Sequence, residues 1–407
     1  MENRLQPLTK TSSHHRSNAD NISTFPVNML PEEIQIRILS RLSTDETLRC
    51  QTVCKPWQMG IKAWASRTPM DYTAQPQKPF YFMYNTEKAY IGTYAYNSDK
   101  EKWVSFMIPN SNKKNSILPL ELPPFSKTDF YISASRGLVC FMDTKSQDNI
   151  FVCNPVIKSQ IRLLPKAPGG RACYCTISMS TDVSSKKFVV AMVKSFPLNN
   201  SSKYKEAIQL YKSDSNSWVN LCTEKVGWLG GETCVICNDI LYTVAQFPCV
   251  LGDTQPFHEI LAYNLSQASQ KNSLAITKVS VPCALTRVRL LNLNGTLTVV
   301  GGIPKDKNMK IKTIGIWKLC ENKLKQITQA PDDDVVSKFL NEIDGAFSTS
   351  GCGNLVFIQS CVSRTLLMYD FSSNVWKVVP KAPLPFEDHD SHYLNGFCFE
   401  PRLDIIP

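Results

Sequence analysis

The sequence predicts an α+β multidomain chain in which a small helical domain precedes a large all-β domain. Apolar residues recur at helical spacing between residues 30 and 64, and short β-rich runs broken by turn residues begin at Phe80. Within the second part, one sequence unit recurs six times, at spacings of about 52 to 58 residues. A chain of 407 residues is too long for one ordinary domain, but it fits a small domain joined to a repeat architecture.

Four segments follow one another in this prediction. Residues 1–24 are polar and predict a disordered tail. Helical signals occupy residues 25–67, and a Pro-containing stretch at residues 68–79 predicts a linker. The all-β domain is expected to span residues 80–407, which is long enough to bury a core of its own.

The first helix is predicted to begin at Leu30-Pro31. Proline suits the first turn because its missing N–H would have no partner there, and Glu32 and Glu33 place negative charge at the positive end of the helix dipole. One face of this helix is apolar. Its members are Ile34, Ile38 and Leu42.

Two more short helices are predicted. Ser43 followed by Glu46 is a capping box, so a second helix should begin near Thr44. Pro56 suits the first turn of a third helix. The apolar residues of these two elements are Leu48, Val53, Trp57, Ile61 and Trp64. A unit of about 40 residues has too little interior for all of these side chains, so some need an outside surface, either the following domain or another protein.

Residues 30 to 57 resemble an F-box, the short helical module that docks on the Skp1 adaptor of cullin ubiquitin ligases. The resemblance rests on the Leu-Pro start, the helical spacing and the Cys-Lys-Pro-Trp end. It implies that eight residues carry the Skp1 contact or the helical frame behind it. These are Leu30, Pro31, Ile34, Ile38, Leu42, Leu48, Val53 and Trp57.

The repeated unit of the second domain is an apolar run, a polar turn, and an apolar or aromatic residue seven positions after the last aromatic of the run. Four clear copies pair Tyr96 with Trp103, Tyr211 with Trp218, Trp317 with Leu324, and Tyr369 with Trp376. Weaker copies centre on Cys153 and Tyr263. A second strand with glycine beside it precedes most copies, so each period supplies several short strands.

One four-stranded sheet cannot cover both of its faces, whereas six arranged radially cover one another and protect their edges. The period and the paired glycines resemble degenerate kelch repeats, which predicts a six-bladed kelch-like β-propeller with each hairpin Trp between blades. An F-box followed by this propeller resembles the plant F-box/kelch-repeat family, whose repeats also carry the label F-box-associated domain. Leu394 to Pro401 is similar to the final segment of the subgroup linked to leaf and floral development.

Composition indicates a globular protein, with 43% hydrophobic and 20% charged residues. The sequence has no apolar run of the roughly 18 residues that a membrane span requires, and its N-terminus lacks the apolar core of a secretory signal. We therefore expect no membrane partner and a location in the cytoplasm or nucleus, where the 15 cysteines would be free thiols.

Few residues suggest metal or catalytic chemistry. Cys234 and Cys237 form a CxxC motif without a second ligand pair, so packing in a buried strand is expected. His389 and His392 form an HxxH in a segment expected to be an exposed loop. We expect no cofactor. The net charge of +10 is taken to be spread over a solvated surface, since its Lys and Arg residues are not interleaved with aromatics, and no nucleic-acid partner is expected.

The two parts together predict the substrate-recognition subunit of an SCF (Skp1-cullin-F-box) E3 ubiquitin ligase, a non-catalytic adaptor whose propeller presents a protein target. Two alternatives remain, a kelch-propeller enzyme (metal oxidase or hydrolase) and an F-box scaffold that ubiquitylates nothing. The target is unknown and is expected on one rim, where loops vary in length. These loops are residues 197–205, 247–258, 304–312 and 331–338, the last with the acidic run Asp332 to Asp334.

Overall fold

The computed structural model describes residues 30–39, 41–42, 44–50, 53, 55–67, 78–85, 90–105, 130–155, 161–198, 204–226, 229–246, 258–267, 276–305, 310–332, 334–343, 347–361, 364–383 and 394–407. The predicted tail, most of the predicted linker, and His389 and His392 lie outside these residues. The chain forms two compact units that divide within the third helix, between Ile61 and Lys62.

The three predicted helices are α1 (Glu32–Leu39), α2 (Thr44–Cys50) and α3 (Lys55–Arg67), and the first unit contains α1, α2 and the part of α3 up to Ile61. The carbonyl of Pro31 accepts hydrogen bonds from the amides of Ile34 (3.0 Å) and Gln35 (3.1 Å), so α1 begins directly after this proline. Pro56 lies in the first turn of α3, where its missing N–H leaves no helical bond unmade. The predicted capping residue Ser43 lies outside the described residues.

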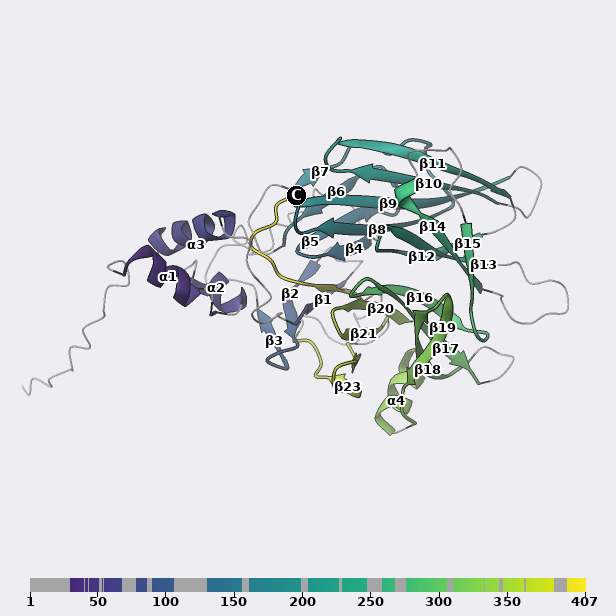
Figure 1. Cartoon of the computed structure of the whole chain (residues 1–407). Helices are drawn as coiled ribbons and strands as arrows, with labels where there is room; N and C mark the ends of the chain where they lie inside the picture. Colours follow the sequence, from purple (N-terminus) through teal and green to yellow (C-terminus); the bar gives the residue numbers. More distant parts are fainter. Residues whose placement is uncertain are drawn as a thin grey trace, which may run out of the picture. The chain divides into compact units, whose positions relative to one another are not determined.

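The second unit is a β-propeller of six antiparallel sheets with four strands each, as predicted (Figure 1). Blade 1 consists of β24 (Leu394–Phe399), β1 (Phe80–Asn85), β2 (Tyr90–Asn97) and β3 (Lys102–Ser105). Blade 2 consists of β4 (Phe130–Ser135), β5 (Leu138–Asp143), β6 (Ile150–Cys153) and β7 (Arg162–Leu163). Blade 3 consists of β8 (Tyr174–Asp182), β9 (Lys187–Pro197), β10 (Tyr204–Lys212) and β11 (Ser217–Val226).

The other three blades follow in sequence order. Blade 4 consists of β12 (Leu229–Cys237), β13 (Ile240–Gln246), β14 (His258–Asn264) and β15 (Ile276–Ser280), with the 3-10 turn η2 (Leu265–Gln267) after β14. Blade 5 consists of β16 (Thr286–Leu293), β17 (Thr296–Pro304), β18 (Ile311–Cys320) and β19 (Lys323–Gln329). The helix α4 (Asp334–Ile343) precedes blade 6, which consists of β20 (Phe347–Cys352), β21 (Leu355–Ser360), β22 (Leu366–Asp370) and β23 (Val375–Val379).

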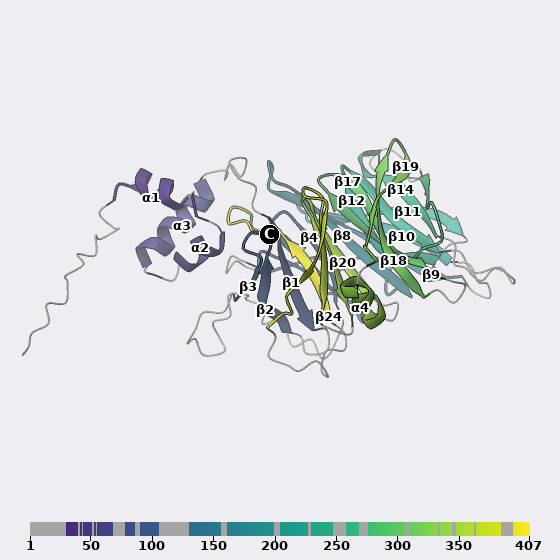
Figure 2. The ribbon, with the colours of Figure 1, turned by 90° about the horizontal axis from the view of Figure 1, so that it is seen from below.

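The first strands of the six blades form a closed inner ring, in which β24, β4, β8, β12, β16 and β20 each contact the next and β20 contacts β24. Figure 2 labels β24, β4, β8, β12 and β20 of this ring. Hydroxyls on these strands accept hydrogen bonds from backbone amides of the following blade. Ser133 accepts from Met179 (2.8 Å), Ser178 from Ile236 (3.0 Å), and Ser350 from Cys398 (2.6 Å). The inner strands are therefore joined by polar bonds as well as by packing.

The six repeat centres occupy the same place in every blade, the third strand, and all are buried. They are Tyr96, Cys153, Tyr211, Tyr263, Trp317 and Tyr369. Three of the predicted aromatic pairs are direct cross-strand partners, Tyr96 with Trp103, Tyr211 with Trp218, and Tyr369 with Trp376.

Each of the three partner tryptophans lies between two blades, as predicted. The indole N–H of Trp103 donates to the Pro380 carbonyl (2.6 Å), and that of Trp218 donates to the Pro165 carbonyl (2.7 Å). The indole N–H of Trp376 donates to the Thr328 hydroxyl (3.2 Å). In every case the acceptor belongs to or directly follows the outermost strand of the preceding blade.

The pairing of Trp317 with Leu324 is a prediction that the structure corrects. Leu324 lies opposite Leu319, and Trp317 lies opposite Gln326 after a register shift. The reason is the turn, which has two residues here, Glu321 and Asn322, both with positive φ. The hairpins of the other three pairs have four-residue turns, so the seven-residue spacing holds only there.

The C-terminal strand β24 completes blade 1, whose other strands come from the start of the propeller. The residues after β24, yellow in Figure 1, then pack on blade 2. The Asn154 amide donates to the carbonyls of Arg402 and Ile405, both at 2.8 Å. The guanidinium of Arg402 forms a buried ion pair with Asp404 (2.8 Å). Both ends of the domain thus hold the ring closed.

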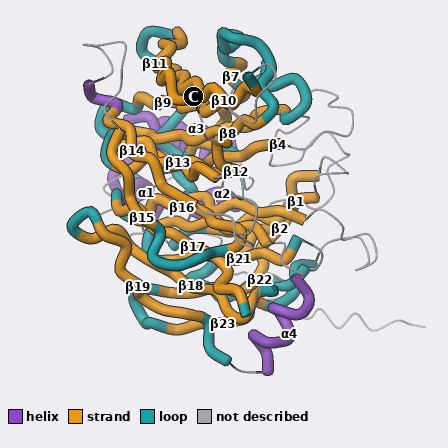
Figure 3. The backbone as a smooth tube through the Cα atoms, turned by 90° about the vertical axis from the view of Figure 1, so that its right-hand side faces the viewer, coloured by secondary structure: helices purple, strands orange, loops and turns teal. Residues whose placement is uncertain are grey.

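Strands account for most of the described propeller (Figure 3). No helix in the described part of the chain is long and apolar enough to span a membrane.

Candidate functional site

The helical unit leaves apolar side chains on its surface. Its interior uses Leu39 and Ile61, which are 5% and 0% exposed. By contrast, Ile34 and Ile38 are each 40% exposed on α1, four residues apart and hence on one helical face. This face is uncovered in the structure.

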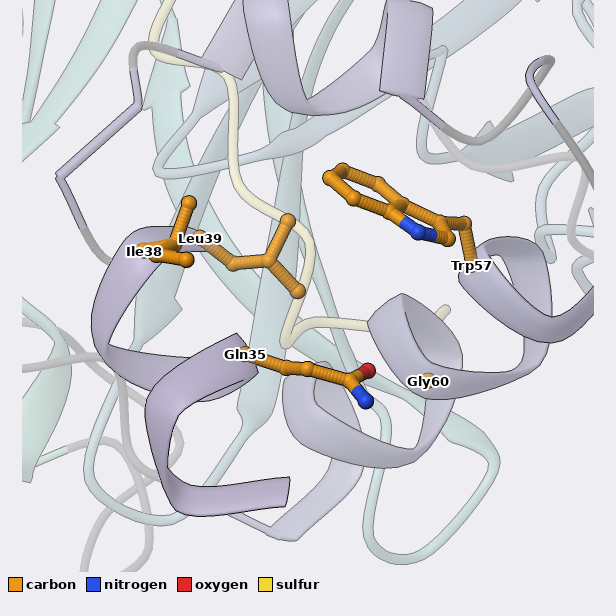
Figure 4. Close-up of a pocket in the computed structure, with 5 residues that line it drawn as sticks. All are labelled: Gln35, Ile38, Leu39, Trp57 and Gly60. Atoms are coloured by element: carbon orange, nitrogen blue, oxygen red, sulfur yellow. The ribbon is translucent and has the colours of Figure 1, made fainter. Parts of the chain in front are cut away.

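A hollow beside this face encloses about 250 Å³, part of it open to solvent. Its lining comes from α1 and α3 and consists of Gln35, Ile38, Leu39, Trp57 and Gly60. Figure 4 shows the side chains of Leu39 and Trp57 pointing toward each other across the hollow, with Gln35 reaching toward Gly60. The hollow is mainly apolar and shallow, because most of this space is open solvent.

The eight residues predicted for the Skp1 contact occupy different environments. Leu30, Leu42 and Trp57 are half-buried, Pro31 is exposed, and Val53 is 70% exposed in the turn before α3. Leu48 belongs to α2, but its side chain is outside the described part of the structure. Together with Ile34 and Ile38, four of the seven members whose side chains are described are exposed, and three are half-buried.

Two further residues of the helical unit were not predicted to have a role. Met59 is 70% exposed on α3, and no helical stripe in the sequence marks it because it lies two residues beyond Trp57. The Gln35 amide donates to the Leu30 carbonyl (2.8 Å), which fixes the start of the helical unit. A glutamine inside an apolar pattern carries no signal of such a role.

The propeller has two different faces, because in each antiparallel blade the turns alternate between the two ends of the sheet. The inner strands run in parallel, since Ser133 and Ser135 of β4 accept from Met179 and Thr181 of β8 in the same order. One face, named here the tight-turn face, carries the turn between the first and second strands of blades 2 to 6, whereas in blade 1 these two strands, β24 and β1, come from opposite ends of the propeller sequence. The other, named here the loop face, carries the loop between the second and third strands and the connection to the next blade.

Short turns on the tight-turn face are linked from blade to blade. The Asn238 amide donates to the Gly295 carbonyl (3.1 Å), and the Asn294 amide donates to the Gly353 carbonyl (3.2 Å). The chain also enters the propeller there, because Phe80 at the start of β1 pairs with Phe399 at the end of β24.

The strand ends that flank the four loops predicted to contact a target all lie on the loop face. Residues 197–205, 247–258 and 304–312 join the second and third strands of blades 3, 4 and 5, and residues 331–338 lie between blades 5 and 6. The middle of the first three loops lies outside the described residues. The sequence alone leaves open on which face of the propeller each loop begins and ends. Strand order answers this question, because the flanking strand ends share one face.

The CxxC motif packs into the propeller core. Cys234 and Cys237 lie on β12 and belong to different apolar clusters on opposite sides of the blade, so their sulfurs cannot bind one ion together. Burial raises the pKa of the Cys237 thiol to about 12 and raises that of Cys234 as well. Across the described residues, no three Cys, His, Asp or Glu side chains gather as a metal site would require.

Comparison with known proteins finds a matching family model for each of the two units. The F-box-like family model matches residues 27–61, and the KIB1-4 beta-propeller model matches residues 105–335. An F-box/kelch-repeat protein of Arabidopsis thaliana is 33% identical, over 95% of this chain and 92% of its own length. An F-box protein of the same plant is 22% identical, over 86% of this chain and 90% of its own. The solved structure of YjhT covers 67% of this chain and 91% of its own, with 11% identity and a TM-score of 0.43.

Proposed function

Because the chain belongs to the F-box/kelch-repeat family, we propose that it is the substrate-recognition subunit of an SCF ubiquitin ligase. In this proposal the F-box binds a Skp1-like adaptor and, through it, cullin. The propeller binds a protein target for ubiquitination and proteasomal degradation. The chain itself acts as an adaptor and forms no covalent bond with the target.

The observation that carries this proposal is the uncovered apolar surface of the helical unit. Ile34, Ile38, Val53 and Met59 expose between 40% and 70% of their surface. Full burial of a side chain that starts fully exposed contributes roughly 1.5 to 3 kcal/mol, so covering these partly exposed side chains contributes a fraction of that amount for each. The shallow apolar hollow at Trp57 adds apolar surface beside Ile38.

The mechanism rests on effective concentration. A target held by the propeller is tethered to the same complex as the ubiquitin-loaded enzyme that the cullin recruits. Tethering makes ubiquitin transfer effectively intramolecular, which raises its rate without any catalytic residue in this chain. The loop face is the surface proposed for the target, because its loops are longer and the chain enters the propeller from the opposite face.

The test uses co-purification of the full chain with a Skp1-like adaptor and cullin. The variant Ile34→Asp with Ile38→Asp places two charges on the apolar face and is expected to lose adaptor capture. A matched control is Val375→Asp with Val378→Asp, since these valines are 40% and 39% exposed on the propeller strand β23. The control is expected to retain capture.

Each result that contradicts the expectation would be interpreted differently. A version that lacks residues 1–67 is expected to lose capture, and retained capture would show that the adaptor binds the propeller instead. Undiminished capture by the Ile34/Ile38 variant would refute the proposed contact. Equal loss in both variants would point to an effect of added charge rather than of this face.

A further inference from the structure

Blade 5 has the largest excess of positive charge among the six blades. Residues 286–329, which span this blade, hold nine Lys and Arg but two Asp and Glu. Residues 130–226, which span blades 2 and 3, hold 13 Lys and Arg against six Asp and Glu, so positive charge also lies elsewhere in the propeller. The distinguishing feature of blade 5 is therefore the density of its positive charge.

Five of these basic residues lie at the loop-face end of blade 5, and we call them the basic cluster. They are Arg287, Arg289, Lys305, Lys310 and Lys312. The two arginines lie on β16 next to its start, and the lysines lie on or beside the hairpin between β17 and β18. A hydrogen bond from the Lys305 amide to the Lys310 carbonyl (2.7 Å) brackets this hairpin.

The backbone at Arg287 is unusual. Its φ is +51°, a left-handed value that costs a non-glycine residue free energy. The other described non-glycine residues with positive φ lie in turns, whereas Arg287 lies inside a strand. A β-bulge between Thr286 and Arg289 adds one residue to β16 there. Bulges of this kind redirect a side chain, and they are enriched next to functional sites.

One acidic residue, Asp306, lies between the cluster lysines in the sequence. Lys305, Lys310 and Lys312 are exposed, and in the described part of the chain they form no ion pair. Burial raises the pKa of the Cys361 thiol on blade 6, while Arg289 and Arg287 lower it, so both guanidiniums lie near the border with that blade. Asp332 and Asp334 follow β19 on the same face, so the cluster has acidic residues on its side toward blade 6.

We propose that the basic cluster is the docking surface for an extended Asp- and Glu-rich segment of the target protein. This inference rests on the function proposed above and names the chemistry of its target. Adjacent strands are about 4.8 Å apart, so the positions from β16 to β18 span about 10 Å. A single phosphate group is smaller than this span, whereas consecutive carboxylates along a peptide can meet the cations one after another.

The test measures binding of a short fluorescent peptide of consecutive Asp and Glu residues to the full chain, by anisotropy at low ionic strength. The variant Lys310→Glu with Lys312→Glu is expected to weaken binding about tenfold. Each exposed ion pair contributes up to about fivefold in affinity, and reversal replaces attraction with repulsion.

A matched control exists on the same blade. Lys323 and Lys325 are also exposed and two residues apart, but they lie at the start of β19, toward the tight-turn face. The variant Lys323→Glu with Lys325→Glu changes the net charge equally and is expected to bind the peptide with unchanged affinity. Equal weakening by both variants would overturn the inference, because it would show attraction to net charge alone.

Three further arms complete the design. A peptide with Asn and Gln in place of Asp and Glu is expected not to bind. Tighter binding of a phosphoserine peptide, or of single-stranded RNA of equal charge, with the same loss in the Lys310/Lys312 variant would overturn the assignment to carboxylates. Failure of the acidic peptide to bind would overturn this inference alone if the chain still captures the Skp1-like adaptor, whereas lost capture would count against the proposed function.

Discussion

Single polar residues close the hairpin turns of the propeller. Asp182 ends β8, and its carboxylate accepts hydrogen bonds from the Ser185 hydroxyl (2.7 Å), the Ser184 hydroxyl (2.7 Å) and the Ser184 amide (3.0 Å). These bonds favour the ionised carboxylate, so they lower the pKa of Asp182 to about 2. The turn between β8 and β9 is consequently sensitive to acid.

Replacement of Asp182 by Asn is expected to lower the unfolding temperature at neutral pH. The folded-state pKa lies below the unfolded value of about 3.9, so the stabilisation is complete above that value and is lost as the pH falls toward 2. The difference between wild type and Asp182→Asn should therefore shrink below about pH 4. Circular dichroism melts of both proteins over this range measure it, and a difference independent of pH would contradict the assignment.

The hairpins show which features of a structural element can be predicted from the amino-acid sequence. The spacing of Tyr211 and Trp218 predicts a hairpin because seven positions correspond to two strand residues, a four-residue turn and the partner. In the turn, Asn216 adopts positive φ and accepts a hydrogen bond from the Tyr211 hydroxyl (2.8 Å). The same arrangement recurs with Tyr369 and Asn374 (2.6 Å). Local chemistry therefore determines the register of these hairpins.

The hairpin at Trp317 shows where this local argument stops. Its ring lies over Gly315, so a side chain at Gly315 would overlap it, and the strand shifts its register just before Trp317. That shift depends on how the ring packs in the core between blades 4 and 5, which spacing along the chain does not encode.

The same limit applies to the helical unit. Periodicity correctly places Ile34 and Ile38 on one face of α1. It does not reveal that Leu39 turns inward, or that Met59 stays exposed, because both depend on how α3 packs against α1. Sequence thus predicts the faces of an element, and packing decides which face is covered.

The closing strand β24 provides a prediction at the level of an element. Gly396 lies opposite Met83 of β1, and a Cβ atom at this position would overlap the ring and hydroxyl of Tyr81. Tyr81 is fully buried, so it has no room to retreat. The variant Gly396→Ala is expected to lower the free energy of unfolding by about 1 to 3 kcal/mol, as overpacking does.

Urea denaturation of the full chain, followed by tryptophan fluorescence, measures this change. The control is Gly60→Ala, because a Cβ atom at Gly60 on α3 meets nothing within 4 Å. An unchanged denaturation midpoint for Gly396→Ala would show that β24 does not close the ring tightly.

At the scale of the whole molecule, the order of the strands determines which face of the propeller the chain enters and which face carries the basic cluster. The ring depends on both ends of the propeller sequence, since β24 pairs with β1 and Asn154 holds the residues that follow β24. The chain enters on the tight-turn face, and the basic cluster lies on the loop face. The point where the chain enters the propeller and the surface proposed for the target therefore lie at opposite ends of the blades.

Assembly into a ligase predicts that the propeller itself becomes a substrate when no target is present. Exposed lysines of the propeller, such as Lys186 and Lys323, would then be available as nucleophiles. Reconstitution with a Skp1-like adaptor, cullin and a ubiquitin-conjugating enzyme should attach ubiquitin to propeller lysines, because tethering raises their effective concentration to the millimolar range. Mass spectrometry of the modified lysines measures this, and the Ile34→Asp/Ile38→Asp variant should show none while the Val375→Asp/Val378→Asp variant matches wild type. Stable assembly without any transfer, to the chain or to an added acidic-tailed protein, would favour a scaffold that binds the adaptor and ubiquitylates nothing.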